Sequence, residues 1–137
     1  MTMAVPRGIR NNNPLNIRHG SKWRGLKREQ TDKAFCQFTT IRYGLRAGFV
    51  LLRTYIQRYQ LRTVPAIVSR WAPVSENDTK RYISIVCRRA NISSCEVIST
   101  TDKNQMCALV EAMCFVECGR SISSIDISVA YSMAYHL

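Results

Sequence analysis

Nine carboxylates are the side chains of this 137-residue chain that could carry out acid chemistry. An acid that protonates the leaving oxygen of a glycosidic bond must keep its proton near neutral pH, and burial against apolar side chains raises its pKa. Glu117 fits this requirement because it follows Met113 by four residues and Val110 by seven, at the end of an apolar helical stripe. A boundary glutamate that pairs with an arginine explains the same position, so its role stays open at this point.

Glu76 is the second candidate. It lies between two predicted helices and is flanked by Trp71 and Tyr82, whose aromatic faces suit sugar rings. Its alternative role is to cap the following helix and compensate the helix dipole. The other carboxylates fall at predicted helix starts, in polar stretches or on the wet side of a helix; they are Glu29, Asp32, Asp78, Glu96, Asp102, Glu111 and Asp126.

The six cysteines indicate neither a disulfide scaffold nor a metal site. No secretory signal of the usual kind is present, and disulfides form in oxidising compartments. Cys107, Cys114 and Cys118 lie in an apolar helical stretch, where a free thiol acts as a small hydrophobe. The last two are four residues apart and could hold a metal, but His19 and His136 have no ligand-like spacing to them. We therefore expect no metal and no cofactor.

Positive charge is concentrated in the first part of the chain. Residues 1–62 contain thirteen lysines and arginines but only Glu29 and Asp32, whereas residues 63–137 contain seven charges of each sign. Such a field attracts polyanions, which include nucleic acid, anionic lipid headgroups and the acidic polymers of a bacterial wall. The alternative explanation is that this positive charge forms a solvated face that only keeps the protein soluble. No recognition helix or RNA-binding motif appears, and no apolar run approaches the ~20 residues of a membrane span.

The sequence pattern predicts one mainly helical (α+β) domain over residues 1–137, with about five helices. Glycines, asparagines and Pro14 break any helical period in residues 1–40, and alternating residues at 34–38 predict one short strand. Apolar residues then recur at three and four positions, which is typical of amphipathic helices. The predicted helices cover approximately residues 41–59, 63–70, 77–90, 102–118 and 123–135.

Local signals predict where these helices begin and end. Thr63 caps a helix that has Pro65 in its first turn, where the missing N–H does no harm. Asp102 and Gln105 fit a capping box, and Gly119 is a natural stop after the helix they begin. Periodicity also predicts three inward faces, which consist of Leu45, Phe49, Leu52, Ile56 and Tyr59, of Tyr82, Ile83 and Val86, and of Ile125, Val129 and Met133.

Two blocks of sequence resemble phage and prophage virion-associated lytic proteins, which are muramidases or lytic transglycosylases. The resemblance rests on residues 7–18 (RGIRNNNPLNIR), 23–25 (WRG), 35–38 (FCQF) and 43–47 (YGLRA), and on a second block at 70–82 (RWAPVSENDTKRY). It implies a lysozyme-like fold with a small strand and loop region near the N-terminus. It also implies cleavage of the glycan between N-acetylmuramic acid and N-acetylglucosamine.

Bacterial glucosaminidases offer a weaker, circularly permuted resemblance. Their helix ending in Glu-Ser-Gly precedes an Asn-Asn segment, a Trp-x-Gly and a Phe-containing strand, whereas here residues 117–119 (ECG) come last. This resemblance implies that Glu117 is the catalytic acid and that the asparagine segment lines the same cleft, so the fold must bring the two ends together. Glu76 is the nearest candidate for a second carboxylate, which a hydrolase needs and a transglycosylase does not.

Ten further residues are predicted to bind substrate. Asparagine amides can donate to and accept from sugar hydroxyls and N-acetyl groups, besides forming turns, and aromatic rings stack on sugars or pack in the core. The predicted substrate-binding residues are Asn11, Asn12, Asn13, Asn16, Trp23, Phe38, Arg46, Trp71, Asn77 and Tyr82.

The expected partner is bacterial peptidoglycan, with other virion proteins as further partners and no specific nucleic acid. We expect a monomer that is synthesised in the cytoplasm and acts at the cell wall or periplasm after delivery, in association with a virion. Two alternatives remain open at this stage. One is a noncatalytic basic virion structural or nucleic-acid-binding protein, and the other is an inactive wall-binding domain of lysozyme fold.

Overall fold

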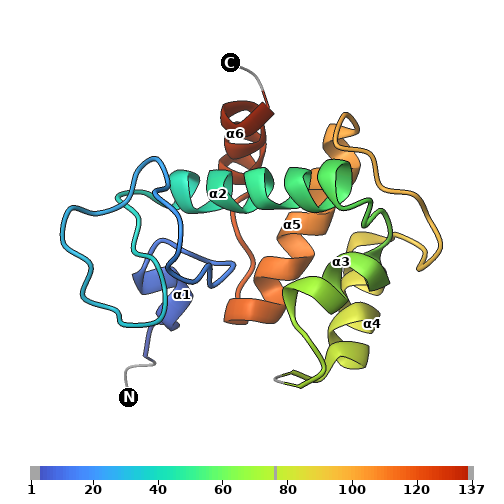
Figure 1. Cartoon of the computed structure of the whole chain (residues 1–137), viewed down its shortest axis with the longest axis horizontal. Helices are drawn as coiled ribbons and strands as arrows, with labels where there is room; N and C mark the ends of the chain where they lie inside the picture. Colours follow the sequence, from blue (N-terminus) through green and yellow to red (C-terminus); the bar gives the residue numbers. More distant parts are fainter. Residues whose placement is uncertain (1–3, 76, 136–137) are drawn as a thin grey trace.

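A computed structural model describes residues 4–75 and 77–135 of the chain, and these residues are mainly helical, as predicted (Figure 1). A π-helical turn, η1, continues α2 directly, so the predicted helix at 41–59 forms as two consecutive elements. The elements are α1 (Arg7–Arg10), α2 (Ile41–Arg53), η1 (Thr54–Arg58), α3 (Val64–Trp71), α4 (Thr79–Ala90), α5 (Lys103–Cys118) and α6 (Ser124–Tyr135).

Helix α5 crosses the middle of the molecule and packs against both α4 and α6 (Figure 1). Helix α2 packs on α6, α3 packs on α4, and the short α1 contacts α5. The N-terminal loop region lies on the left in Figure 1 and α3 and α4 lie together on the right. No helix in the described parts of the chain is long and apolar enough to span a membrane.

Helix α2 follows the predicted pattern closely. The Thr40 side chain accepts a hydrogen bond from the Tyr43 N–H, which caps the helix at its predicted start. The predicted stripe is buried from Leu45 through Ile56. Tyr59 is an exception, since 44% of it is exposed, because the helical backbone ends at Arg58 and the periodic pattern no longer applies.

The caps of the later helices also lie near the predicted positions. The Thr63 side chain accepts from the Ala66 N–H, and Asp102 Oδ1 accepts from the Gln105 N–H at 3.1 Å. The reciprocal half of the predicted capping box is wrong, because the Gln105 carboxamide oxygen accepts from the Ser99 N–H at 2.8 Å instead of from Asp102. Helix α5 ends at Gly119, whose φ of 70° is the left-handed conformation that glycine adopts most easily.

The predicted inward face of α6 is wrong. Ile125 is 66% exposed, and Val129 and Met133 are only half-buried. The buried face consists of Ile127, Ala130, Tyr131 and Ala134. Apolar residues surround most of this helix, so periodicity alone offered two overlapping stripes, and packing against α2 and α5 selects the other one.

The predicted strand at 34–38 does not form as a continuous strand. Two isolated antiparallel bridges, Arg18 with Phe35 and Leu26 with Phe38, replace it. The N-terminal loops instead depend on close contact with α2. A Cβ atom at Gly44 would lie 1.9 Å from the Asn12 carbonyl oxygen, and one at Gly48 would lie 2.2 Å from Leu15 Cδ1. These two glycines therefore allow the asparagine-rich segment to pack directly on the helix.

Candidate active site

The Glu117 carboxylate lies at the C-terminal end of α5 and is held by side chains from three other segments. Its Oε1 accepts a hydrogen bond from Asn16 Nδ2 at 3.1 Å, and its Oε2 accepts one from the Tyr82 hydroxyl at 2.9 Å. The Trp71 side chain provides a further hydrogen bond. Asn16 Nδ2 also lies 3.2 Å from the Glu117 carbonyl oxygen, which fixes the asparagine to the end of the helix.

Burial raises the pKa of the Glu117 carboxyl above its ordinary value of 4.5, and this is the largest influence on it. The hydrogen bonds from Asn16, Tyr82 and Trp71 act in the opposite direction because they stabilise the ionised form, as does the positive charge of Arg18. Burial outweighs these contributions. The site therefore favours a carboxyl that keeps its proton to a higher pH than an exposed glutamate does.

A pocket of about 190 Å³ opens beside this carboxyl. It is lined by Asn16, Arg18, Phe35, Trp71, Ala72, Asn77 and Glu117. A second pocket of about 180 Å³ shares Asn16, Arg18 and Trp71 with the first and is otherwise lined by Ile17, Leu51 and Tyr55. The two pockets adjoin at these three shared residues, and we call them together the Glu117 groove.

The N-terminal segment meets the end of α5 at Gly8, Asn16 and Cys118. Asn16 and Glu117 are 101 residues apart, so the expected meeting of the two ends of the chain is present in the fold. Asn16 adopts a left-handed backbone with φ of 52°, and its Oδ1 is buried without a hydrogen-bond partner among the described residues. A Cβ atom at Gly8 would lie 2.9 Å from the Asn13 carbonyl oxygen and 3.1 Å from Asn16 Oδ1, so glycine at this position keeps Asn16 in place.

The other three asparagines of the segment use their side chains to hold the loops together. Asn11 donates to Asp32 Oδ2 at 3.0 Å, and Asn12 donates to the Phe38 carbonyl at 3.1 Å. Asn13 is fully buried and donates to the carbonyls of Ile17 and Cys36. None of the three lines the Glu117 groove. Asn16 is therefore the one asparagine of this segment whose side chain meets the Glu117 carboxyl.

Trp71, Asn77 and Tyr82 lie at the site in different ways. Trp71 is half-buried at the end of α3 and lines both pockets, and Asn77 is exposed and lines the pocket beside Glu117. Tyr82 is buried, so its ring offers no open face for a sugar, and its hydroxyl contacts Glu117. The predicted substrate-binding role of Tyr82 is therefore corrected to one of positioning the carboxyl.

Phe38, Trp23 and Arg46 do not line the Glu117 groove. Phe38 is 0% exposed, so its side chain has no surface for a ligand and its predicted contact with substrate is wrong. Trp23 is half-buried against the core, and its Nε1 has no hydrogen-bond partner among the described residues. Arg46 lies on α2, near Arg53 of the same helix and Arg24 of the N-terminal loops. Burial, together with these two like charges, lowers the pKa of Arg46. For Trp23 and Arg46 a role in binding stays a prediction.

The predicted second acid, Glu76, lies outside the described residues. Among the residues that the structure describes, Glu117 is the one carboxylate that lines the groove. Whether a second carboxylate completes the site therefore stays a prediction. In the same described parts of the chain, no group of three or more histidines, cysteines or acids is arranged to hold a metal ion, and all six cysteines are free thiols.

Six groove residues were not predicted as site residues from the sequence: Ile17, Arg18, Phe35, Leu51, Tyr55 and Ala72. Arg18 is exposed, and its guanidinium carbon lies 5.0 Å from the centroid of the Phe35 ring. Tyr55 belongs to η1 and meets Trp71 edge to face, with ring centroids 5.8 Å apart. The π-helical turn was the signal that could have drawn attention to Tyr55, because such turns often occur at functional sites, but its presence is visible only in the fold.

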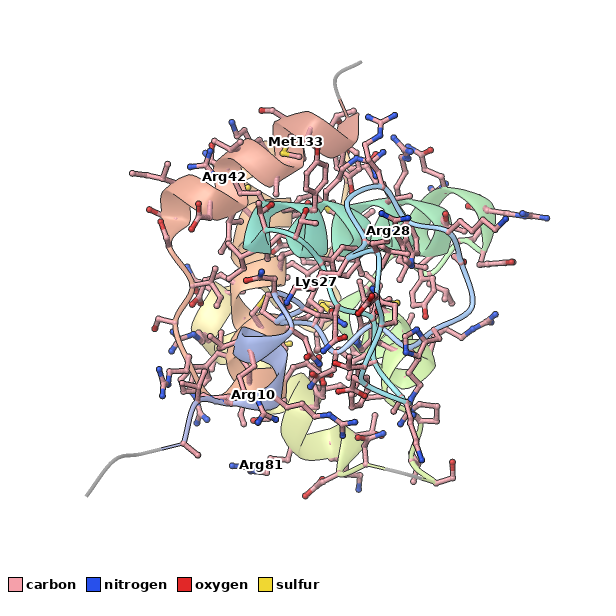
Figure 2. All side chains as sticks on the ribbon, turned by 90° about the vertical axis from the view of Figure 1, so that its left-hand side faces the viewer. Arg10, Lys27, Arg28, Arg42, Arg81 and Met133 are labelled. Carbon is pink, nitrogen blue, oxygen red and sulfur yellow. The ribbon has the colours of Figure 1, made fainter. Side chains whose placement is uncertain are left out.

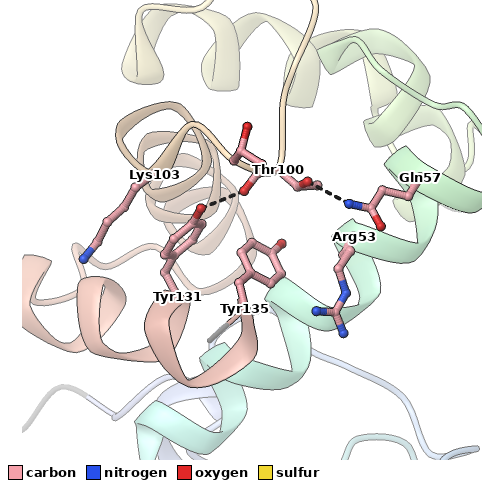
Figure 3. Close-up of a pocket in the computed structure, with 7 residues that line it drawn as sticks. Arg53, Gln57, Thr100, Lys103, Tyr131 and Tyr135 are labelled. Carbon is pink, nitrogen blue, oxygen red and sulfur yellow. Dashed lines mark hydrogen bonds between the residues drawn. The ribbon is translucent and has the colours of Figure 1, made fainter. Parts of the chain in front are cut away.

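A larger cavity of about 560 Å³ lies at the other end of α5 (Figure 3). It is lined by Arg53, Gln57, Thr100, Thr101, Lys103, Tyr131 and Tyr135. Lys103 begins α5 and Glu117 lies in its last turn, so the two sites are roughly 20 Å apart at ~1.5 Å per helical residue. Among the described residues no carboxylate lines this cavity, and two of its lining side chains bond to Thr100, since Gln57 Nε2 donates to Thr100 Oγ1 at 2.9 Å and the Tyr131 hydroxyl donates to the Thr100 carbonyl at 2.7 Å. The carboxyl with the raised pKa therefore lies at the smaller groove and not at this cavity.

The comparisons with known proteins give one partial relative and no family. No family model matches the chain. Protein P5 of Pseudoalteromonas phage PM2 is 46% identical to it over 90 residues, which is 63% of this chain and 56% of that protein. The chain thus matches just over half the length of that relative. Its name assigns no activity to it, but it is a protein of a phage.

Proposed function

We propose that this protein cleaves the glycan strands of peptidoglycan between N-acetylmuramic acid and N-acetylglucosamine, with Glu117 as the general acid. One observation carries the proposal: a carboxyl with a raised pKa lines an open, mostly polar groove and is oriented by hydrogen bonds to both of its oxygens. This is the environment that a glycosidase acid requires. The resemblance of the sequence to virion-associated lytic proteins supports the same reaction.

The proton-transfer step follows from the groups around Glu117. The protonated carboxyl donates its proton to the glycosidic oxygen as the bond from that oxygen to the anomeric carbon breaks, so the leaving sugar departs as an alcohol. Glu117 is then ionised, and the hydrogen bonds from Asn16 and Tyr82 are directed at its two oxygens. These donors are neutral. They orient the carboxyl and stabilise its ionised form after proton transfer, but they do not outweigh the burial that raises its pKa beforehand.

Two routes complete the reaction, and they differ in what attacks the anomeric carbon. In a hydrolase a second carboxylate assists water, and Glu76 is the residue we propose for that role. In a lytic transglycosylase the 6-hydroxyl of the muramic acid attacks its own anomeric carbon and closes an anhydro ring, so no second carboxylate is needed. The products separate the routes, since the first leaves a reducing end and the second an anhydro end.

The basic first part of the chain would hold the enzyme on the anionic wall. Figure 2 looks onto the side of the N-terminal loops, where the labelled Arg10, Lys27, Arg28 and Arg42 are spread over the face. Diffuse positive charge of this kind gives attraction that weakens as salt rises, because the Debye length shortens to roughly 8 Å at physiological ionic strength. We propose peptidoglycan as the partner of this face.

The phage origin of the relative supports a place among virion proteins. A virion component could reach the wall or periplasm during infection, and neighbouring virion proteins would be its partners there. The proposed place in a virion explains how the protein would reach the cell wall, and it does not depend on the chemistry proposed for Glu117.

The test is digestion of purified peptidoglycan by the wild type and two variants on the same helix. Glu117→Gln removes the proton donor, and general acid catalysis typically contributes ~10²–10⁴-fold in rate, so we expect product release to fall by about that factor. Glu111→Gln is the matched control, because Glu111 forms an ion pair with Arg89 at 2.7 Å and does not line the groove. It should retain its rate within about twofold, as surface pairs contribute little.

Absence of product release by the wild type would exclude the enzyme and favour the noncatalytic alternatives, which the net charge of +11 also supports. Retention of glycans on the protein without release would then indicate an inactive wall-binding domain. Binding that duplex DNA competes away equally well would indicate a general polyanion-binding virion protein. Full activity of Glu117→Gln would transfer the role of the acid to another residue, with Glu76 first.

A further inference from the structure

We propose that the Glu117 groove selects acidic sugars over neutral ones, with Arg18 as the residue that binds the carboxylate of the glycan. This inference rests on the proposed function and extends it from the bond that is cleaved to the class of sugar polymer that is accepted. It distinguishes a strand containing muramic acid from a neutral β-linked polymer of N-acetylglucosamine, which has the same backbone linkage but no carboxylates.

The position of Arg18 is the first observation. Arg18 lines both pockets of the groove, together with Asn16 and Trp71. It is the one lysine or arginine that lines either pocket among the residues described. A sugar chain that occupies both pockets therefore passes Arg18 whichever way it runs.

The availability of its charge is the second observation. The Arg18 side chain is exposed, and its guanidinium carbon lies 5.0 Å from the centroid of the Phe35 ring. The ring has no oxygen or nitrogen acceptor, so this contact leaves the guanidinium N–H donors for a ligand. Glu117 is the one acid that lines the groove in the described parts of the chain, and burial favours its neutral form. Arg18 forms no salt bridge with an acid in the described parts of the chain, so its positive charge favours an anionic ligand in the groove.

The aromatic wall next to Arg18 is the third observation. Trp71 is half-buried and lines both pockets, and Tyr55 meets it edge to face in the second pocket. Aromatic rings of this kind take the apolar face of a sugar ring, while a guanidinium binds a carboxylate with two parallel hydrogen bonds. A sugar ring that carries a carboxylate satisfies both groups at once, whereas a neutral sugar leaves Arg18 unused.

Binding measurements on a catalytically disabled protein test the inference. In the Glu117→Gln background, calorimetry would compare three tetrasaccharides: a neutral one of N-acetylglucosamine, one with N-acetylmuramic acid at alternate positions and free lactyl carboxylates, and the same strand with its stem peptides. We expect the acidic strands to bind about tenfold more tightly than the neutral one at low salt. The stem peptide is joined by an amide to the lactyl carboxyl, so a preference for the strand with free lactyl groups alone identifies the lactyl carboxylate as the ligand. A preference for the peptide-bearing strand alone identifies a peptide carboxylate, and a preference for both shows that Arg18 accepts either.

Substitutions at Arg18 assign the effect to that residue. Arg18→Gln should remove most of the tenfold preference, because it weakens binding of the acidic strands far more than binding of the neutral tetrasaccharide, which a general loss of structure would not do. Arg18→Lys should restore part of the preference, since it keeps the charge but not the bidentate geometry. Arg28→Gln is the matched control, because it removes the same charge from an exposed loop residue outside the groove.

Equal binding of neutral and acidic strands would overturn the inference, and so would an equal loss of preference in Arg28→Gln and Arg18→Gln. The outcome is separable from that of the proposed function, because binding is measured without cleavage. A wild type that releases no product but shows the Arg18-dependent preference would retain the inferred ligand class and lose the proposed reaction. Cleavage without the preference would do the reverse.

Discussion

Two carboxylates, Asp32 and Glu117, are each held by an asparagine of the same N-terminal segment, yet their pKa values move in opposite directions. Asp32 accepts from Asn11 Nδ2 at 3.0 Å, and Glu117 accepts from Asn16 Nδ2 at 3.1 Å. The pKa of Asp32 lies well below its usual range, chiefly because of the hydrogen bond from Arg7, whereas burial raises the pKa of Glu117. The difference lies in the other groups around each carboxylate.

The donors to Asp32 are a guanidinium and backbone amides. Arg7 Nε lies 2.6 Å from Oδ2, and the N–H groups of Ala34 and Phe35 donate to Oδ1 at 2.9 and 3.0 Å. The donors to Glu117 are neutral side chains, and they do not compensate for its burial. The comparison shows that an asparagine contact alone says little about the role of a carboxylate. A charged partner lowers the pKa of a carboxyl, whereas with neutral partners the burial of the carboxyl can raise it.

The largest expected contrast is in catalysis. Glu117→Gln should lower glycan release by ~10²–10⁴-fold. Asp32→Asn should leave the rate per folded molecule close to that of the wild type, because Asp32 holds the loops and does not line the groove. Both rates would be measured at a temperature where circular dichroism shows the variants to be folded. A loss in Asp32→Asn as large as that in Glu117→Gln would remove the distinction between the two sites.

A methyl group at the junction of the N-terminal segment and α5 should have the next largest effect. Gly8→Ala would place a Cβ atom 2.9 Å from the Asn13 carbonyl oxygen and 3.1 Å from Asn16 Oδ1. Overpacking of this kind costs about 1–3 kcal/mol, and the displacement of Asn16 should also lower the rate of glycan release. Urea unfolding and a digestion assay measure the two effects. Wild-type stability and activity in Gly8→Ala would show that this contact does not position the acid.

Stability should respond to pH with opposite signs at the two carboxylates. Because the folded pKa of Glu117 is raised above 4.5, its contribution is fully present below pH 4.5 and is lost as pH rises through the folded value. Glu117→Gln should therefore stabilise the protein at pH 8 more than at pH 4. The folded pKa of Asp32 is lowered, so the stability that its ionised form contributes is present above pH 3.8 and is lost as pH falls through the folded value. Asp32→Asn should therefore destabilise the protein at pH 8 and destabilise it less in acid. Urea unfolding at both pH values measures this, and equal signs for the two variants would contradict it.

The smallest expected effect is at Tyr82. Its hydroxyl donates to Glu117 Oε2 and lowers the pKa of that carboxyl, so Tyr82→Phe should raise this pKa further. The alkaline limb of the pH–rate profile, where the acid loses its proton, should move to higher pH while the maximal rate changes little. A positioning role predicts this shift. A sugar-stacking role would predict a higher KM with an unchanged profile.

Most of the helical framework followed from local signals. Thr63 caps the start of α3 and Gly119 caps the end of α5, because capping depends on neighbours only a few residues away in the chain. The face of α6 could not be predicted, since Ile125 and Ile127 are equally apolar and only packing against other helices distinguishes them. Arg18 could not be recognised either, because one exposed arginine among twenty basic residues carries no local mark.

The sequence by itself determined the mainly helical framework, the concentration of positive charge before residue 63 and the short set of carboxylates that includes Glu117. Only the tertiary structure decided which asparagine meets that carboxylate, that the Tyr82 hydroxyl donates a hydrogen bond to it, and that Arg18 lines the groove beside it. The physical reason is that helix formation depends on neighbours in the sequence, whereas a pKa depends on neighbours in space. The asparagine that binds Glu117 is 101 residues away from it along the chain.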